Sequence, residues 1–139
     1  IGVTAMVDDA YPEVMDIMRS GRIDTVQIPY NVVQRTVEEG VLPLAEELGI
    51  GVMVMEPLKK GRYVKELKGE PDLTPLKEFG IETWAQALIS WVVSDPRVSI
   101  TIPATSRPER INENALSGSL GTMPQELRDY VREETVRLL

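Results

Sequence analysis

Residues 100–114 of the chain are Ile-Thr-Ile-Pro-Ala-Thr-Ser-Arg-Pro-Glu-Arg-Ile-Asn-Glu-Asn. The segment begins as a short β-branched run, turns after Pro103, and continues from Pro108 with charged residues typical of a first helical turn. Such a helix start offers unpaired backbone N–H groups and the positive end of the helix dipole, and both favour an anion. The segment therefore predicts a strand that leads into an anion-binding helix N-terminus.

Four polar side chains around this helix start could complete a phosphate site. Arg107 and Arg110 are three residues apart, so they can project to the same side of the helix. Thr105 and Ser106 precede them and add two hydroxyl groups. The same residue types also occur at helix caps that bind nothing, beside arginines that are solvated. Phosphate binding and simple capping are therefore both open on this pattern alone.

Strand and helix patterns alternate along the chain. Runs with strand composition lie at residues 1–4, 24–31, 51–55 and 98–102. Apolar residues recur at helical spacing within residues 14–20, 37–49, 84–92 and 124–138. Residues 62–80 are polar and contain several Gly and Pro residues, so we expect a loop with one short helix there. This alternation is the βαβ rhythm of an α/β protein with a parallel sheet.

Several segments carry the motifs of one protein family. They are Ile-Gly-Val-Thr at residues 1–4, Val-Gln-Ile-Pro-Tyr-Asn at 26–31, Glu-Pro-Leu-Lys-Lys-Gly at 56–61, Ile-Pro-Ala-Thr at 102–105 and Arg-Ile-Asn-Glu-Asn at 110–114. They resemble motifs of strands five to eight, and of the helix after strand eight, in the aldo/keto reductases. The last two correspond to the family's Ile-Pro-Lys-Ser and Arg-x-x-Glu-Asn.

The resemblance implies half of a (β/α)8 TIM barrel, with four parallel strands alternating with helices plus a C-terminal helix. The chain has 139 residues, whereas a complete barrel has roughly 250. We therefore expect residues 1–139 to be a single unit, the C-terminal half-barrel, with a long βα-loop at about residues 56–82. Because the chain begins with strand sequence and no initiating Met, we expect it to be a piece of a longer protein.

The resemblance also implies that this half binds NADP(H). By position, Thr105 and Arg110 would contact the 2′-phosphate, and Glu113 and Asn114 would contact the adenine. The family aligns a Lys with Ala104, so one positive charge is missing from the 2′-phosphate site. Arg107, which has no fixed counterpart in the family, is the expected replacement. The preference between NADP(H) and NAD(H) stays open.

The other end of the cofactor would lie along the earlier strands. The resemblance places Thr4 and Gln27 beside the nicotinamide carboxamide, and Met55 where many members stack an aromatic residue on the nicotinamide. The backbone of Pro57 and Leu58 and the charge of Lys59 or Lys60 would follow the pyrophosphate, although an exposed lysine pair more often only solubilises a protein. From the residues alone, a glutamine such as Gln27 can equally well serve only to satisfy backbone groups, so this alternative also stays open.

The composition argues against several kinds of site. The net charge is −7 without a basic stripe, which disfavours binding to nucleic acid and to anionic membranes. The chain has neither Cys nor His, so disulfides, thiolate metal sites and Ser-His or Cys-His catalytic pairs cannot be built within it. No apolar run approaches the roughly 20 residues of a membrane span, and we expect a cytoplasmic protein.

In the family, a Tyr donates a proton to the carbonyl oxygen while NADPH donates a hydride, and an Asp, a Lys and usually a His support that Tyr. All four belong to the first four strands, and Tyr30 matches a different, packing position. The resemblance therefore implies that this chain is the cofactor-holding half of an oxidoreductase. It would act on a carbonyl substrate only together with the missing half, which carries the proton donor. Two alternatives are a half-barrel scaffold that pairs with itself or with that half, and a non-enzymatic nucleotide-binding module.

Overall fold

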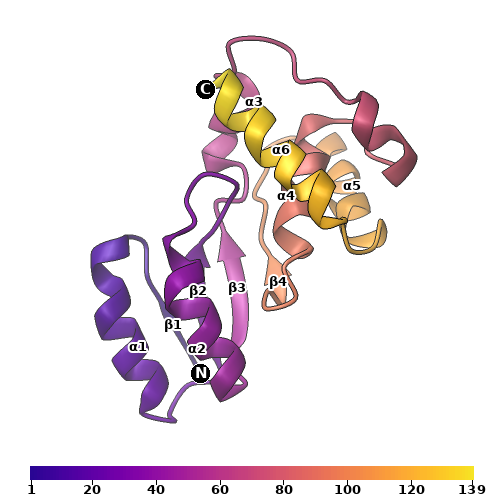
Figure 1. Cartoon of the computed structure of the whole chain (residues 1–139). Helices are drawn as coiled ribbons and strands as arrows, with labels where there is room; N and C mark the ends of the chain where they lie inside the picture. The colour runs from indigo at the N-terminus through magenta and orange to yellow at the C-terminus, as the bar shows by residue number, and fades with distance from the viewer.

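The computed structural model describes residues 1–139 and contains one sheet flanked by helices (Figure 1). The strands are β1 (Gly2–Thr4), β2 (Thr25–Pro29), β3 (Gly51–Met55) and β4 (Ile100–Thr101). The α-helices are α1 (Tyr11–Arg19), α2 (Val41–Leu48), α3 (Arg62–Lys65), α4 (Trp84–Val93), α5 (Glu109–Leu116) and α6 (Gln125–Leu138). Short 3-10 helices lie at Asp8–Ala10, Thr36–Glu39, Lys59–Gly61, Thr74–Phe79 and Ser117–Ser119. No helix has both the length and the apolar character needed to cross a membrane.

The four strands form one parallel sheet in the order β1-β2-β3-β4. This arrangement confirms the predicted fold class, in which four parallel strands alternate with helices and a C-terminal helix follows. The register places Thr4 beside Gln27, Gln27 beside Met53, and Met53 beside Ile100. Because successive side chains of a strand alternate between faces, these four residues form one row on the same face of the sheet.

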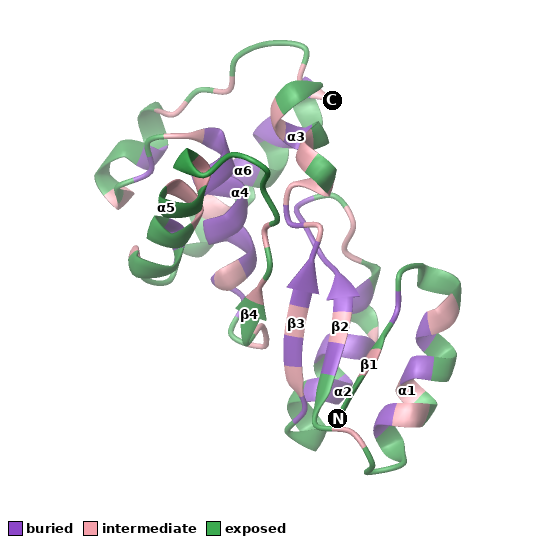
Figure 2. Cartoon of the chain, turned by 180° about the vertical axis from the view of Figure 1, so that it is seen from behind, coloured by how far each residue is buried: buried purple, intermediate pink, exposed green.

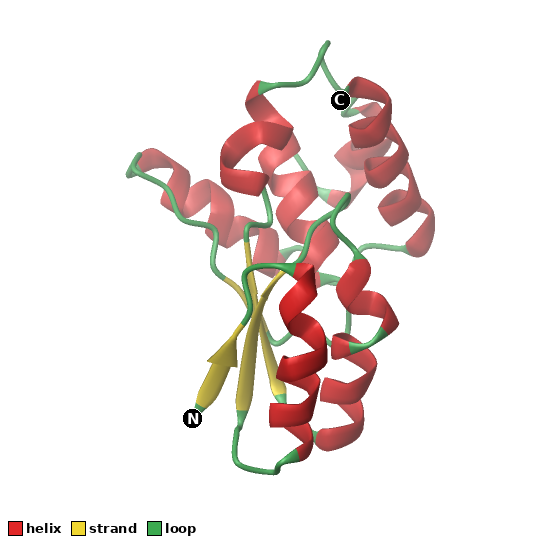
Figure 3. Ribbon diagram, turned by 90° about the vertical axis from the view of Figure 1, so that its left-hand side faces the viewer, coloured by secondary structure: helices red, strands yellow, loops and turns green.

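Helices α1 and α2 cover one face of the sheet and leave the other without a covering helix (Figure 3). On the covered face, Val26, Ile28, Val52 and Val54 are buried, which explains the nearly continuous apolar sequence of β2 and β3. On the opposite face, Ile100 of β4 keeps 51% of its surface exposed. Figure 2 shows part of β4 in the colour of exposed residues. The sheet therefore has one packed face, one open face, and unpaired edges at β1 and β4.

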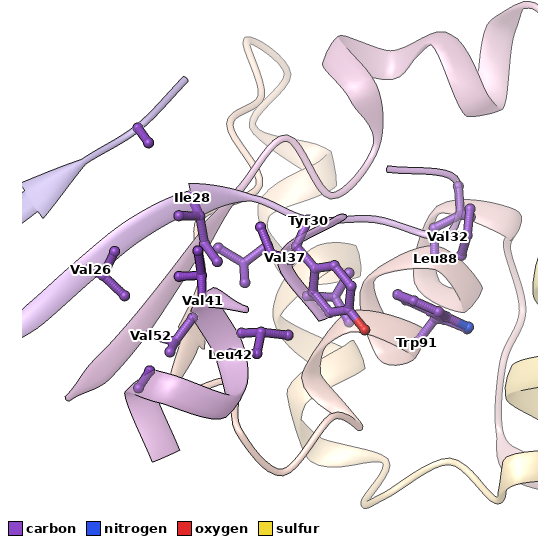
Figure 4. Packing of buried hydrophobic residues seen from close by; sticks show 14 of the residues in the cluster. Val26, Ile28, Tyr30, Val32, Val37, Val41, Leu42, Val52, Leu88 and Trp91 are labelled. Atoms are coloured by element: carbon purple, nitrogen blue, oxygen red, sulfur yellow. The ribbon is translucent and has the colours of Figure 1, made fainter. Parts of the chain in front are cut away.

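The hydrophobic core continues from the sheet into the C-terminal helices as one cluster. Tyr30, just after β2, packs against Trp91 of α4 with the ring centroids 5.2 Å apart (Figure 4). The predicted apolar stripe of α4, which includes Trp84 and Trp91, is part of this core. The helix begins with a capping box, in which Thr83 and Gln86 each accept a hydrogen bond from the other's backbone N–H.

A group of polar and charged side chains joins the end of β2 to α4 and α6. The Tyr30 hydroxyl donates a 2.6 Å hydrogen bond to Glu38 and also lies 3.1 Å from an oxygen of Asp95. Asp95 is 2% exposed and accepts two hydrogen bonds from the guanidinium of Arg97, at 2.7 and 2.9 Å. Arg128 of α6 lies 3.9 Å from the same carboxylate. These contacts fit the packing role predicted for Tyr30.

The contacts within this group determine how its members titrate. Burial raises the pKa of Tyr30 above its ordinary value, and the hydrogen bond to Glu38 raises it further. Burial alone would also raise the pKa of Asp95, but the hydrogen bonds from Arg97 outweigh it and hold that pKa below its ordinary value. The pKa of Glu38 is lowered in the same way, because hydrogen bonds from Arg35 and Tyr30 outweigh its burial.

The structure differs from the predicted boundaries in four places, and the first is β2, which spans Thr25–Pro29 instead of 24–31. β4 is shorter than the predicted 98–102, although Ser99 and Ile102 on either side still donate backbone hydrogen bonds to β3. Residues 62–80 contain both α3 and a 3-10 helix, more helix than predicted. The predicted helix at 37–49 is divided, because Gly40 has a non-helical backbone (φ −148°, ψ −63°) that separates a 3-10 turn from α2. Leu48, one of the apolar residues at helical spacing in the predicted helix 37–49, is 43% exposed at the end of α2.

Candidate functional site

A cavity of about 420 Å³ lies between the loop after β3 and the segment that joins β4 to α5. Both segments follow the carboxyl ends of neighbouring parallel strands, where open α/β sheets bind their ligands. The predicted site residues that line the cavity are Pro57, Leu58, Thr105, Ser106, Arg107, Arg110 and Asn114. The structure therefore brings together the two segments that the sequence assigned to phosphate groups, although they lie far apart in the chain.

One wall of the cavity is the turn that leads into α5. The Thr105 hydroxyl accepts a 3.1 Å hydrogen bond from the backbone N–H of Arg107, and this bond fixes the turn before the helix. Arg107 is exposed, Arg110 is half-buried, and neither forms an ion pair within the chain. Two arginines without carboxylate partners at a helix start are available to an anion.

The opposite wall is the loop after β3, and its backbone is strained. Glu56, Lys59 and Lys60 have positive φ angles of 55°, 47° and 56°, which side chains of these types rarely adopt. Such residues cost of order 1 kcal/mol each, and they cluster at ligand sites. The Glu56 carboxylate lies 2.8 Å from the Lys59 ammonium and 3.3 Å from that of Lys60. The hydrogen bond from Lys59 holds the pKa of Glu56 below its ordinary value.

The charges that line the cavity are mostly positive. Lys60, Lys65, Arg107 and Arg110 contribute four positive charges, and Glu56 contributes one negative charge. The chain as a whole has a net charge of −7, so the sign of the cavity is opposite to that of the molecule. Cations gathered beside the N–H groups of a helix start favour a ligand that carries phosphate.

Three other predicted residues form a separate group outside the cavity lining, on the open face of the sheet. Thr4 and Gln27 are adjacent in the register of β1 and β2. The Gln27 amide donates to the sulfur of Met55 at 3.6 Å. The structure thus places these three residues near one another, with Thr4 and Met55 at the carboxyl ends of β1 and β3 and Gln27 at the middle of β2.

Glu113, which the resemblance assigned to adenine, does not line the cavity. Its carboxylate accepts a 2.5 Å hydrogen bond from the hydroxyl of Thr83, so it joins α5 to the start of α4. The sequence carries no signal for this contact, because the two residues are 30 positions apart. Glu56 and Lys65 do line the cavity but were not predicted, because the polar loop after β3 has no periodicity that reveals its path.

The parallel sheet and the cationic cavity at its carboxyl ends define an α/β protein suited to a phosphate-bearing ligand. The sequence model of the Aldo/keto reductase family matches residues 1–133, and the chain belongs to this family. Its four strands and their helices match part of the α/β TIM barrel of solved aldo-keto reductases. The family predicted from the motifs is therefore confirmed.

Two solved structures and one further protein illustrate the similarity. An aldo-keto reductase from Klebsiella pneumoniae in complex with NADPH has a TM-score of 0.74 and 26% identity, over 96% of this chain and 47% of that one. The holo form of an aldo-keto reductase from Bacillus halodurans has a TM-score of 0.70 and 18% identity, over 95% and 48%. The NADH-specific methylglyoxal reductase of Escherichia coli (strain K12) is 24% identical over 136 residues, 90% of this chain and 41% of that protein. The chain spans less than half the length of each.

Proposed function

We propose that this chain is the NADP(H)-holding, C-terminal half of an aldo/keto reductase barrel. The observation that carries the proposal is the cavity between the loop after β3 and the segment that joins β4 to α5, whose lining includes four cationic side chains and one carboxylate. The choice of cofactor is supported by the Klebsiella pneumoniae relative, a complex with NADPH that matches 96% of this chain. The cavity volume of about 420 Å³ also falls within the usual range of about 300–1,000 Å³ for cofactor sites.

The cavity residues are assigned to the phosphorylated end of the cofactor. Arg107 and Arg110 hold the 2′-phosphate, and the hydroxyls of Thr105 and Ser106 are further donors to it. Asn114 lies about one turn beyond Arg110 on α5 and is assigned to the adenine. Because Glu113 is bonded to Thr83, it takes no part in this assignment.

The remaining predicted residues are assigned to the other end of the cofactor. The backbone of Pro57 and Leu58 follows the pyrophosphate along the loop after β3. Thr4 and Gln27 orient the nicotinamide carboxamide, and Met55 packs against the ring as a soft, polarizable partner. When bound, NADPH supplies the hydride for the reduction of a carbonyl substrate.

The proton donor for that reduction is assigned outside this chain. Tyr30 is fully buried and its hydroxyl is bonded to Glu38, while Tyr11 and Tyr63 are 5% and 6% exposed. Tyr130 uses its hydroxyl to donate to a backbone carbonyl. None of the four lines the cavity. We therefore expect the chain alone to bind cofactor without reducing carbonyls at an enzymatic rate.

The test is a calorimetric titration of the chain with NADPH and, separately, with NADH, which gives the dissociation constant of each cofactor. NADPH should bind at least about tenfold more tightly, because its 2′-phosphate can accept charge-assisted hydrogen bonds worth about 1.5–3 kcal/mol each. Equal affinities would count against the 2′-phosphate assignment. Reduction of an aldehyde as fast as by a full-length reductase would contradict the assignment of the proton donor to the other half.

A second proposal concerns the open face and the unpaired edges of the sheet. Ile100 and Ile102 are 51% and 40% exposed at the edge formed by β4. A groove of about 620 Å³ beside this strand is lined in part by Ile89 and Ile111. Unpaired edges and exposed apolar surface favour the addition of strands. We propose that four further parallel strands of a (β/α)8 barrel cover this surface, which fits the match to 47% of the Klebsiella pneumoniae structure.

The isolated chain can obtain such strands only from a second copy, so we expect it to dimerise through this surface. Sedimentation velocity should detect the dimer, and Ile100→Lys should shift it toward the monomer by placing a charge on the β4 edge. Leu48→Lys is the matched control, because Leu48 is similarly exposed on α2, away from that edge. A native chain that stays monomeric at every concentration would overturn the proposal, as would equal effects of the two substitutions.

A further inference from the structure

We infer that Lys65, assisted by Lys60, supplies the positive charge that Ala104 lacks, and so makes this cavity select NADP(H) over NAD(H). The inference rests on the proposed function and adds a specificity-determining residue to it. Both lysines belong to the β3 side of the cavity, whereas Ala104 belongs to the β4 side. Lys65 and Lys60 would thus bring positive charge to the 2′-phosphate from the β3 wall, where a lysine at position 104 would bring it from the β4 wall.

Lys65 is the last residue of α3 and lies one turn after Gly61, the glycine that precedes this helix. Gly61 has φ +86°, and a Cβ added to it would lie 3.6 Å from Cε and 3.7 Å from Nζ of Lys65. The end of the lysine side chain therefore lies beside the backbone of Gly61. Lys65 is exposed, and both residues line the cavity.

Lys65 also has no competing partner within the chain. Arg62, at the start of α3, donates a 2.8 Å hydrogen bond to Glu66, the residue that follows the helix. No carboxylate lies within ion-pair distance of the Lys65 ammonium. An ammonium that is held over a cavity without a counter-ion is available to an anionic ligand.

Lys60 can contribute without leaving an uncompensated carboxylate. It lies 3.3 Å from Glu56 and its side chain is 77% exposed, so the contact is loose. Glu56 has a closer partner in Lys59, at 2.8 Å. If Lys60 turns to a phosphate, Lys59 still neutralises Glu56. The β3 wall can therefore present two ammonium groups opposite Arg107 and Arg110.

The test compares NADPH and NADH binding to Lys65→Gln by calorimetry. We expect the dissociation constant for NADPH to rise about fivefold to tenfold, and that for NADH to change less than about twofold, since only NADPH carries the 2′-phosphate. Lys68→Gln is the matched control, because Lys68 is exposed in the same loop but outside the cavity lining. Thermal unfolding of both variants verifies that they fold.

A rescue experiment completes the test. Adding Ala104→Lys to the Lys65→Gln variant should restore most of the NADPH affinity, because the charge returns to the same cavity from the other wall. If the native chain prefers NADPH and Lys65→Gln keeps that preference, the inference is wrong and the proposed function stands. If the native chain does not distinguish the two cofactors, the proposed function itself fails.

Discussion

Replacing Asp95 with alanine is expected to lower the free energy of unfolding by about 3 kcal/mol. The carboxylate is 2% exposed and accepts two hydrogen bonds from Arg97, with Arg128 3.9 Å away. Its removal leaves Arg128, whose side chain is 14% exposed, without its counter-ion. It also removes one of the two carboxylates beside the buried Tyr30 hydroxyl. Breaking a buried pair costs more than the pair contributes, because a charge is left desolvated and alone.

Urea denaturation of the native and variant chains measures this loss. Asp16→Ala is the matched control, because it removes a carboxylate of an exposed pair with Arg19 and should cost no more than about 0.5 kcal/mol. Asp95→Asn keeps the size of the side chain and should still lose most of the stability, since the charge is what compensates the two arginines. An Asp95→Ala variant as stable as the Asp16→Ala control would show that the buried group contributes nothing.

The same variant should alter the acid sensitivity of the fold. The folded-state pKa of Asp95 lies below its ordinary value of 3.8, so its stabilising contribution is present above that value and is lost as the pH falls through the folded pKa. Glu38, with a pKa lowered from 4.5, contributes in the same direction. The native chain should therefore lose stability below about pH 4, and Asp95→Ala should show a shallower decline.

Some elements of this fold are determined by the local sequence pattern, and these were predictable from the sequence. Features that depend on contacts between distant residues were not. The continuous apolar run Gly51–Met55 predicted the bounds of β3, and the spacing of Trp84 and Trp91 predicted α4 as core. Tyr30 and Asp95 lie 65 positions apart, so no periodicity could indicate their contact.

The candidate site divides in the same way. Its β4 wall was predicted, because the turn chemistry of Thr105 and the spacing of Arg107 and Arg110 are local features. Its β3 wall was predicted at the Pro57–Leu58 motif and at the charge of Lys59 or Lys60, but not at Glu56 or Lys65. The position of Lys65 depends on the left-handed backbone of the residues before α3, and a sequence without periodic signal does not reveal where such a loop turns.

Replacing Arg110 with alanine is expected to weaken NADPH binding about thirtyfold, or about 2 kcal/mol, while NADH binding changes less than about twofold. Arg110 is half-buried in the first turn of α5, lines the cavity and has no carboxylate partner, so its guanidinium is free to bind a phosphate. Calorimetric titration of both cofactors gives the two ratios. Arg22→Ala, an exposed arginine outside the cavity, is the matched control.

The comparison with lysine separates a phosphate contact from a general effect of charge. Arg110→Lys keeps the positive charge but removes the planar pair of N–H donors that matches two phosphate oxygens, so it should recover only part of the lost affinity. If Arg110 serves only as a solvated residue of a capped helix start, Arg110→Ala will weaken NADPH and NADH binding equally or not at all. A selective loss for NADPH, partly restored by lysine, requires that the guanidinium meet the 2′-phosphate directly, because NADPH and NADH differ only in that group.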